Sequence, residues 1–331
     1  MARRLYTSSV HPESLSAFVA CRLIPIDKSP GVRPIGIGEV PRRIIAKSIL
    51  KVVSNDIQEA AGPLQACAGH EAGCEAAVYT MNEIMSSEET EAILLVDATN
   101  AFNTINRQAA LHNIGVICPA ISTVLNNTYQ TPVKLFVTGG VVVESSEGIT
   151  QGDPLAMAMY ALAVTPLIQR LRSEEPSVKQ VWFADDSTAG GKIEALRRWW
   201  QCLSAIGPPM GYHPNGSKTH LIVKPEFQED ANHIFEGTGI VVTIEGHEML
   251  GSTVGSTSFA KEFAAHKGEE FVEEIENLSK IAEHYLQSAY AAFSHYIVGK
   301  WRYMMRTMKD IDTISTVRRR DQSNLYSCIN W

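Results

Sequence analysis

Three aspartates in this chain have the right type and setting to hold metal ions. Asp185 and Asp186 are adjacent and follow the apolar residues 181–184, and Asp97 ends a short apolar strand expected at residues 92–96. Like charges beside apolar residues resist ionisation unless a cation neutralises them. If the end of that strand lies beside a hairpin tip at residues 185–186, three carboxylates converge. Such a set suits two Mg2+ ions about 3.5–4 Å apart, the arrangement for in-line phosphoryl transfer.

Each of these signals is weak when taken alone. Isolated Asp-Asp pairs are usually helix caps or solvated turns, and a single aspartate at a strand end is usually a turn former. A second set of potential ligands, Cys67, His70 and Cys74, has no further pair at ligand spacing. Small residues on a packed helix explain that second set better than a zinc site does.

The elements that must position the aspartates mix helices and strands. Hydrophobic periodicity and turn residues predict helices at about 41–60, 70–85, 106–128 (two, broken near Pro119), 154–171 (capped by Asp153), 193–205, 271–285 and 290–308. The same signals predict loop and short-strand structure at 22–40, and strands at about 92–96, 132–138, 141–146, 178–184, 187–189, 219–224, 239–244 and 247–251. Because these elements do not alternate as βαβ units, the predicted fold class is α+β.

The length, the apolar segments and the cysteines of the chain limit the class of protein that it can belong to. The 331 residues suffice for two or three subdomains, and the longest apolar run without a charge, residues 155–168, is too short to span a bilayer. The start of the chain lacks the apolar segment of a secretion signal, and the six cysteines have no disulfide spacing. We therefore expect an intracellular protein, cytoplasmic or nuclear, without a membrane partner.

The charges are distributed unevenly along the chain. Residues 1–51 hold nine Lys/Arg against three acids, and residues 285–331 hold seven against three. The remaining residues, 52–284, carry a net charge of −17, which brings the total to −7. Basic ends are compatible with phosphate binding, although ordinary surface charge explains them equally well.

Six segments resemble, in order, the sequence blocks of reverse transcriptases from retroelements. The resemblance extends from about Cys21 to Met308 and is greatest to retrotransposons that lack long terminal repeats. The matching segments are residues 24–28 with 31–35 (IPIDK, GVRPI), 96–102 (VDATNAF), 148–155 (GITQGDPL), 183–186 (FADD), 211–219 (GYHPNGSKT) and 249–251 (MLG).

The resemblance implies a right-hand polymerase fold with fingers, a palm built on an antiparallel sheet, and a helical thumb. The expected divisions are fingers at 1–91, palm at 92–258 with a fingers insertion at about 106–146, thumb at 259–312 and a tail at 313–331. Leu250 and Gly251 match the block that grips the primer. The basic and aromatic helix at residues 300–306 would belong to the thumb, unless it is an ordinary amphipathic helix.

The resemblance also implies roles for individual residues. Asp97, Asp185 and Asp186 match the catalytic triad that holds two Mg2+ ions, with Mn2+ as a possible substitute, and the Ala98 carbonyl matches an additional metal ligand. Phe102 matches a steric gate, where a bulky ring fills the space that a ribose 2′-hydroxyl needs. The alternative for Phe102 is a core aromatic beside the sheet.

Further positions match contacts to the incoming nucleotide. Arg33 and Lys28 match residues that grip the triphosphate, or they are solvated loop charges. Gln151 and Gly152 precede an expected helix N-terminus, which favours anions, although capping by Asp153 predicts the same sequence. Lys218 matches a lysine that protonates the leaving pyrophosphate, or it is a surface lysine.

The implied partners are a primed RNA or DNA template and deoxynucleoside triphosphates. Asn103 departs from the family pattern, where aspartate is common, at a position not expected to bind metal. Two alternatives remain open. An RNA-dependent RNA polymerase shares the palm and the Asp-Asp pair, and a degenerate remnant would bind nucleic acid without catalysis. The sequence does not indicate an oligomeric state, and the chain can be a fragment of a longer polyprotein.

Overall fold

The strand expected at residues 92–96 lies in the middle of the largest sheet. In the computed structural model, which describes residues 1–28 and 31–308, β3 (Ala92–Val96) is buried along its whole length. Antiparallel neighbours flank it on both sides. The sheet has the strand order β6-β7-β3-β8-β9, with β6 Lys179–Phe183, β7 Asp186–Gly191, β8 His220–Val223 and β9 Val241–Thr243.

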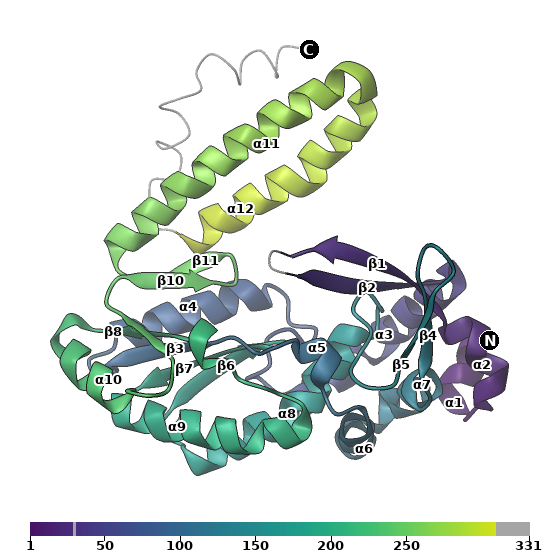
Figure 1. Cartoon of the computed structure of the whole chain (residues 1–331), viewed down its shortest axis with the longest axis horizontal. Coiled ribbons are helices and arrows are strands. Elements are labelled where there is room, and N and C mark those ends of the chain that lie inside the picture. The colour runs from purple at the N-terminus through teal and green to yellow at the C-terminus, as the bar shows by residue number, and fades with distance from the viewer. Residues whose placement is uncertain (29–30, 309–331) are drawn as a thin grey trace.

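Alternate side chains of β3 face two different layers. Leu94 and Val96 join the main core, which includes α8 (Ala156–Glu174) and α9 (Ile193–Ile206), whereas Ile93 and Leu95 pack with α4 (Gly73–Ser86). In Figure 1, α8 and α9 lie below the sheet and α4 lies above it. By the same alternation, Asp97 shares the face of Ile93 and Leu95.

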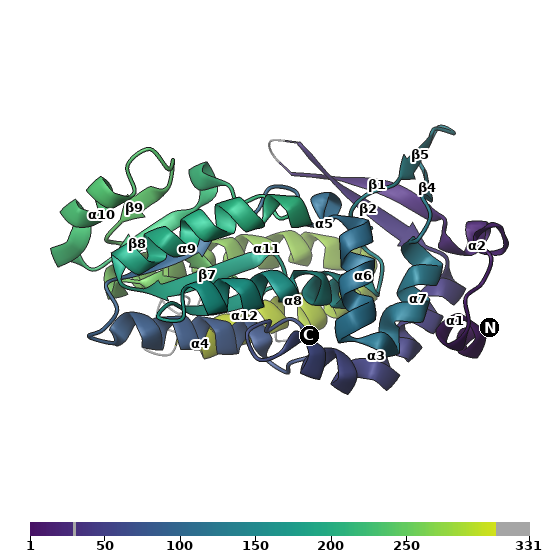
Figure 2. The same cartoon turned by 90° about the horizontal axis from the view of Figure 1, so that it is seen from below.

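A second sheet combines segments from two distant parts of the sequence. Its strand order is β2-β1-β4-β5, with β1 Cys21–Asp27, β2 Val32–Gly38, β4 Val133–Phe136 and β5 Val142–Ser145. β1 and β2 form an antiparallel hairpin, and β4 lies parallel to β1. Figure 2 shows these strands at the same end of the molecule as α1, α2, α3, α6 and α7.

The C-terminal part of the described chain forms a small hairpin and a long helical pair. β10 (Gly246–Met249) and β11 (Ser252–Gly255) make a separate antiparallel hairpin. α11 (Thr257–Ala292) and α12 (Val298–Thr307) lie side by side above this hairpin (Figure 1). The backbone of Tyr285 is not helical, so the expected break between two helices is confirmed.

The remaining elements are short helices and the long α3. They are α1 Ala2–Thr7, α2 Pro12–Val19, α3 Val40–Ala61, α5 Ala101–Thr104, α6 Arg107–Ile117, α7 Pro119–Tyr129, α10 Gln228–Ile234, the 3-10 turns Pro208–Met210, Gly216–Lys218 and Pro225–Phe227, and the π-helical turn Phe293–Ile297. None of the helices within residues 1–28 and 31–308 combines the length and apolar content needed to cross a bilayer.

Most expected elements are confirmed, with four corrections. The helix expected from His70 begins at Gly73, because Ala72 has a positive φ. Asp153 does not cap the next helix: α8 begins at Ala156, and the Asp153 carboxylate is buried against Arg42. The loop and short-strand structure expected at residues 22–40 is a hairpin of two seven-residue strands, β1 and β2, so the strands are longer than expected. Five elements were not expected, namely α1, α2, α5, α10 and β11. The expected tail at 313–331 and the end of the expected thumb lie outside the described residues.

Candidate active site

The turn between β6 and β7 brings the three aspartates together. The last residue pair of these strands joins Phe183 to Asp186, so Ala184 and Asp185 form a two-residue turn. β3 pairs with β7 as far as residue 96, which lies opposite residue 187. One further step along that register puts Asp97 opposite Asp186. Carboxylates from two strands and one turn therefore meet at one edge of the sheet.

Burial and neighbouring charges raise the pKa of both carboxylates of the turn, Asp185 and Asp186. Burial raises the pKa of Asp185, and the charge of Asp97 adds to the effect, whereas Arg33 and Lys28 act in the opposite direction. Burial, followed by the charges of Asp185 and Asp97, raises the pKa of Asp186 to about 7. Arg33 and Lys28 are exposed residues of the β1–β2 hairpin. Their influence on Asp185 means that the hairpin directs positive charge toward the acidic cluster.

The chemistry of this cluster fits divalent cations. Carboxylate oxygens are ligands for Mg2+, and mutual repulsion among like charges is relieved by a cation. The hydrogen bonds that join this segment to residues 213–215 use the Asp97 carbonyl and the Thr99 amide, and so leave the Ala98 carbonyl out of the pairing. Within the described residues, no three His, Cys, Asp or Glu side chains, the three aspartates included, are already arranged as a metal site. The His70 ring forms a hydrogen bond with Gln58 at 2.9 Å.

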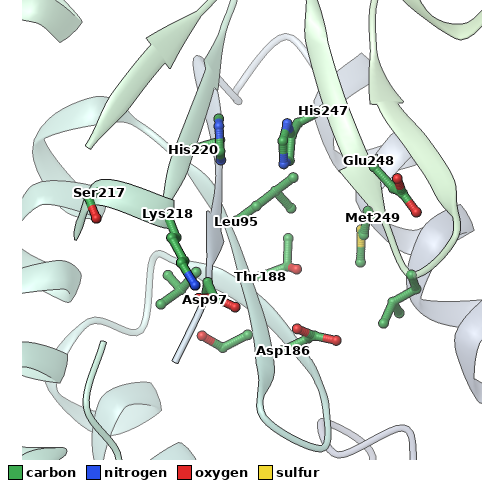
Figure 3. Close-up of a pocket in the computed structure, with 13 residues that line it drawn as sticks. Leu95, Asp97, Asp186, Thr188, Ser217, Lys218, His220, His247, Glu248 and Met249 are labelled. Atoms are coloured by element: carbon green, nitrogen blue, oxygen red, sulfur yellow. The ribbon is translucent and has the colours of Figure 1, made fainter. Parts of the chain in front are cut away.

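A cavity of about 390 Å³ lies beside the cluster, between the main sheet and the β10–β11 hairpin. Figure 3 shows Asp97, Asp186 and Lys218 at one end of it. Its other end is closed by His220 and His247, whose rings stack with centroids 3.6 Å apart. Lys218 is therefore placed near the aspartates, on the exposed 3-10 turn Gly216–Lys218.

The turn at Gln151 and Gly152 packs against β2 rather than at a helix N-terminus. The Gly36 amide donates to the Gln151 carbonyl at 2.7 Å. Gly152 has a φ of +99°, and a Cβ there would lie 2.8 Å from the Gly36 carbonyl oxygen. α8 begins at Ala156, so a helix-dipole contribution at residues 151–152 stays a prediction. The turn joins the β1–β2 hairpin to the segment that leads into α8.

Phe102 lies on α5, close after Asp97, and is half-buried. Its ring stacks on Tyr160 with the centroids 4.4 Å apart. Tyr160 is buried, and burial, then the charges of Tyr212, Asp185 and Asp186, raises its pKa. The Phe102 ring therefore rests on a side chain that itself approaches the aspartates.

Leu250 and Gly251 form the turn of the β10–β11 hairpin. Both have a positive φ, of 51° and 77°, and the flanking pair is Met249 with Ser252. The Tyr303 hydroxyl donates to the Leu250 carbonyl at 2.6 Å and connects the turn to α12. Leu250 lines the cavity beside the aspartates, so the hairpin tip faces the same space.

Two residues outside the expected set hold the aspartate turn. The Tyr212 hydroxyl donates to the Asp185 carbonyl at 2.9 Å and lies 3.1 Å from the Ser187 hydroxyl. Gln65, which is fully buried, bonds to both backbone groups of Ala184. Tyr212 lies within a segment that the sequence blocks include, whereas no periodicity or motif signal identifies Gln65.

Comparisons with known proteins agree with this geometry. The sequence profile described as "Reverse transcriptase (RNA-dependent DNA polymerase)" matches residues 26–253. No curated protein matches the chain. Similar solved structures include apo telomerase from Candida tropicalis, with a TM-score of 0.55 and 11% identity over 97% of this chain and 61% of that chain. Another is telomerase from Candida albicans in complex with a fragment of telomeric RNA, with a TM-score of 0.52 and 10% identity over 94% and 58%.

A third structure, apo telomerase from Candida tropicalis truncated from its C-terminal domain, has a TM-score of 0.54 and 10% identity over 74% and 54%. The chain thus spans less than two thirds of the length of these telomerase chains, and identities this low establish a shared fold alone. The profile match is of a different kind, because it covers most of the sequence and includes all three aspartates. The chain belongs to the reverse transcriptase (RNA-dependent DNA polymerase) family.

Proposed function

We propose that this chain is an RNA-directed DNA polymerase that adds deoxynucleotides to a primer 3′ end on an RNA or DNA template. The observation that carries the proposal is the convergence of Asp97, Asp185 and Asp186 at one sheet edge, with Arg33 and Lys28 directed toward them. Clustered carboxylates suit metal-assisted phosphoryl transfer, and the facing cations suit a triphosphate.

Asp97, Asp185 and Asp186 would hold two Mg2+ ions, or Mn2+ as a substitute, together with the Ala98 carbonyl. Such ions, when bound, supply Lewis-acid stabilisation of the attacking 3′-oxygen and of the leaving pyrophosphate. The protein's own part is to hold these oxygens on a buried strand and a short turn, so that little reorganisation is needed during the reaction.

The surrounding residues would bind the nucleotide. Arg33 and Lys28 would grip the triphosphate from the β1–β2 hairpin. Gln151, whose carbonyl accepts from Gly36 of that hairpin, and Gly152, which packs against it, would support the nucleotide and its templating base. Lys218, at the cavity beside Asp97, would donate a proton to the departing pyrophosphate.

The remainder of the chain would position the primed template. We assign fingers to residues 1–91, palm to 92–258 with a fingers insertion at about 106–146, and thumb to 259–312. The parallel pairing of β1 with β4 supports the insertion, because it joins residues 133–136 to the sheet of the N-terminal segment. Leu250 and Gly251, at a turn bonded to α12, would contact the primer backbone.

Primer extension on an RNA template tests the proposed activity. Purified, folded protein with Mg2+ and four deoxynucleoside triphosphates is expected to lengthen a labelled DNA primer. The matched reaction with EDTA in place of Mg2+ is expected to give no product, because the carboxylates then hold no cation. If the folded wild-type chain extends no primer with either Mg2+ or Mn2+, the proposed activity is refuted. The alternative of a remnant that binds nucleic acid without catalysis would then remain.

Replacing Phe102 with alanine is expected to weaken discrimination against ribonucleotides. The Phe102 ring, held against Tyr160, would fill the space of a 2′-hydroxyl. Its removal should raise the ratio of ribonucleotide to deoxynucleotide incorporation by roughly 10- to 100-fold, the range for a steric contact worth 1–3 kcal/mol. Single-nucleotide kinetics with matched dNTP and rNTP measure this ratio. Phe136→Ala, at an exposed phenylalanine, is the control.

An unchanged sugar preference in the Phe102 variant would assign the ring to the core instead. A wild-type enzyme that already prefers ribonucleotides would favour the RNA polymerase alternative. The proposed preference for deoxynucleotides therefore has a separate test from the polymerase activity itself.

We further infer that the chain derives from a retrotransposon without long terminal repeats. The support is the order and spacing of the sequence blocks, from residues 24–28 to 249–251. The telomerase structures support the fold only. They do not distinguish an origin in a retrotransposon without long terminal repeats from an origin in one that has them. Sequencing the genomic flanks of the gene tests this inference, and long terminal repeats on both sides would contradict it.

A further inference from the structure

The aspartate turn has a backbone conformation that its own sequence does not favour. Ala184 has a φ of +55° and is one of four non-glycine residues with positive φ in the described chain. The left-handed region is costly for residues with a Cβ, and it persists where surrounding contacts enforce it. Ala184 directly precedes Asp185, so its conformation determines where the two carboxylates of the turn point.

Gln65 supplies contacts of this kind. Its Oε1 accepts from the Ala184 amide at 2.9 Å, and its Nε2 donates to the Ala184 carbonyl at 3.3 Å. The side chain is fully buried, so water does not compete for these bonds. Glutamine suits the position because one neutral side chain both donates and accepts. A carboxylate here would lose the donor and add negative charge beside the aspartates.

The backbone around Gln65 is itself fixed to β6. The Ala66 amide donates to the Trp182 carbonyl at 2.7 Å, and the Trp182 amide donates to the Leu64 carbonyl at 2.7 Å. Residue 65 thus lies beside the strand that leads into the turn. A Cβ at Gly73 would overlap the Ala66 carbonyl, so the start of α4 packs tightly behind this segment. The amide of Gln65 therefore approaches Ala184 from a rigid support.

We propose that Gln65 is a positioning residue for catalysis: by binding both backbone groups of Ala184, it holds Asp185 and Asp186 in the arrangement that receives divalent cations. The proposal rests on the proposed polymerase function. Gln65 does not touch substrate or cation in this role, and it acts through the backbone of the turn. Its loss should therefore impair cation binding and nucleotide addition, and leave template binding unchanged.

The test compares Gln65→Leu with a matched variant in β6, the strand beside which Gln65 lies. Gln180 is also buried, and its amide donates to the Ile168 carbonyl at 3.3 Å and accepts from the Trp182 indole at 3.0 Å. Gln180→Leu therefore removes a buried amide with two hydrogen bonds that do not reach the turn. Gln65→Glu is nearly isosteric and serves if the leucine variant does not fold.

The expected results separate positioning from general loss of structure. Gln65→Leu and Gln65→Glu should each lower the rate of single-nucleotide addition and the affinity for Mn2+ by roughly 10- to 100-fold. The Kd for primed template should stay within about twofold of wild type. The Ala184 amide should exchange its hydrogen faster in Gln65→Leu, which leaves no acceptor for it, whereas Gln65→Glu keeps an acceptor oxygen and loses only the donor to the Ala184 carbonyl. Gln180→Leu should change none of these beyond about threefold.

Three outcomes would overturn the proposal. They are Mn2+ affinity and addition rate near wild type in the Gln65 variants, equal losses in Gln180→Leu, and unchanged amide exchange at Ala184 in Gln65→Leu. An inactive but folded wild type would instead refute the proposed polymerase function. Mn2+ affinity and amide exchange would still decide the role of Gln65 in that case.

Discussion

Asp185→Asn is expected to slow nucleotide addition by on the order of a thousandfold or more, while the fold and template binding remain near wild type. The substitution keeps the shape of the side chain but removes one of three charges that together attract the cations. Asp185 is half-buried in a turn whose backbone is held by Gln65 and Tyr212, so the asparagine should keep the position of the side chain. Single-turnover kinetics with a primed RNA template measure the effect.

The matched control is Asp230→Asn, at an exposed acid in the first turn of α10. It makes the same change of charge away from the cluster and should leave the rate within about twofold. Template affinity, measured by fluorescence anisotropy, should be unchanged in both variants. An Asp185→Asn protein that retains more than about a tenth of the wild-type rate would refute the catalytic assignment.

In the absence of metal, Asp185→Asn is expected to be at least as stable as the wild type. Burial and neighbouring charges raise the pKa of Asp185 and Asp186 in the folded protein, which means that their ionised forms oppose folding. The loss of stability is absent below the pKa of the unfolded state. It develops as the pH rises from that value to the folded pKa, about 7 for Asp186, and it is complete above it. Removing one charge relieves it at pH 8, so thermal melting in EDTA should show an equal or higher Tm.

The aspartate cluster was predictable because local and long-range signals coincide there. Residues 92–96 are all apolar and end on Asp97, which is the pattern of a strand buried on both faces. The Asp-Asp pair falls between two segments of strand character, so a hairpin places it at a tip. Once both are strands of one sheet, the register alone brings residue 97 opposite residue 186.

The residues that support the cluster were not predictable in the same way. Gln65 lies in an irregular segment between α3 and α4, and its role depends on a contact with a residue 119 positions away. Nothing in its neighbourhood distinguishes it from a surface glutamine. The same holds for β11, whose four residues become a strand only by pairing with β10 across a tight turn.

Arg42 was predictable in part. The helical pattern places it on the buried side of α3, although arginine is usually exposed. The buried side of α3 consists of positions 42, 46, 49, 53, 57 and 61, and five of these six residues are apolar. Because arginine is rarely buried unless its charge is paired, an arginine at a core position of a helix predicts a buried acidic partner. The partner, Asp153, was assigned to a helix cap, since an aspartate before a proline has that local signature.

Asp153→Ala is expected to lower the free energy of unfolding by about 3–5 kcal/mol, the range for removing one member of a buried ion pair. The side chains of Arg42 and Asp153 are only 3% and 0% exposed. Asp153 also accepts from the Tyr129 hydroxyl at 2.9 Å and from the Leu155 amide at 2.9 Å. Its loss leaves the Arg42 charge buried without a carboxylate. Chemical denaturation followed by circular dichroism measures the change.

A matched ion pair at the surface distinguishes burial from pairing. Glu174→Ala breaks the exposed pair with Arg170 and should cost less than about 1 kcal/mol. The double variant Arg42→Met/Asp153→Leu should recover much of the loss in Asp153→Ala, because it leaves no buried charge. If Asp153→Ala costs no more than Glu174→Ala, the buried pair does not hold α3 against the turn at residues 151–152.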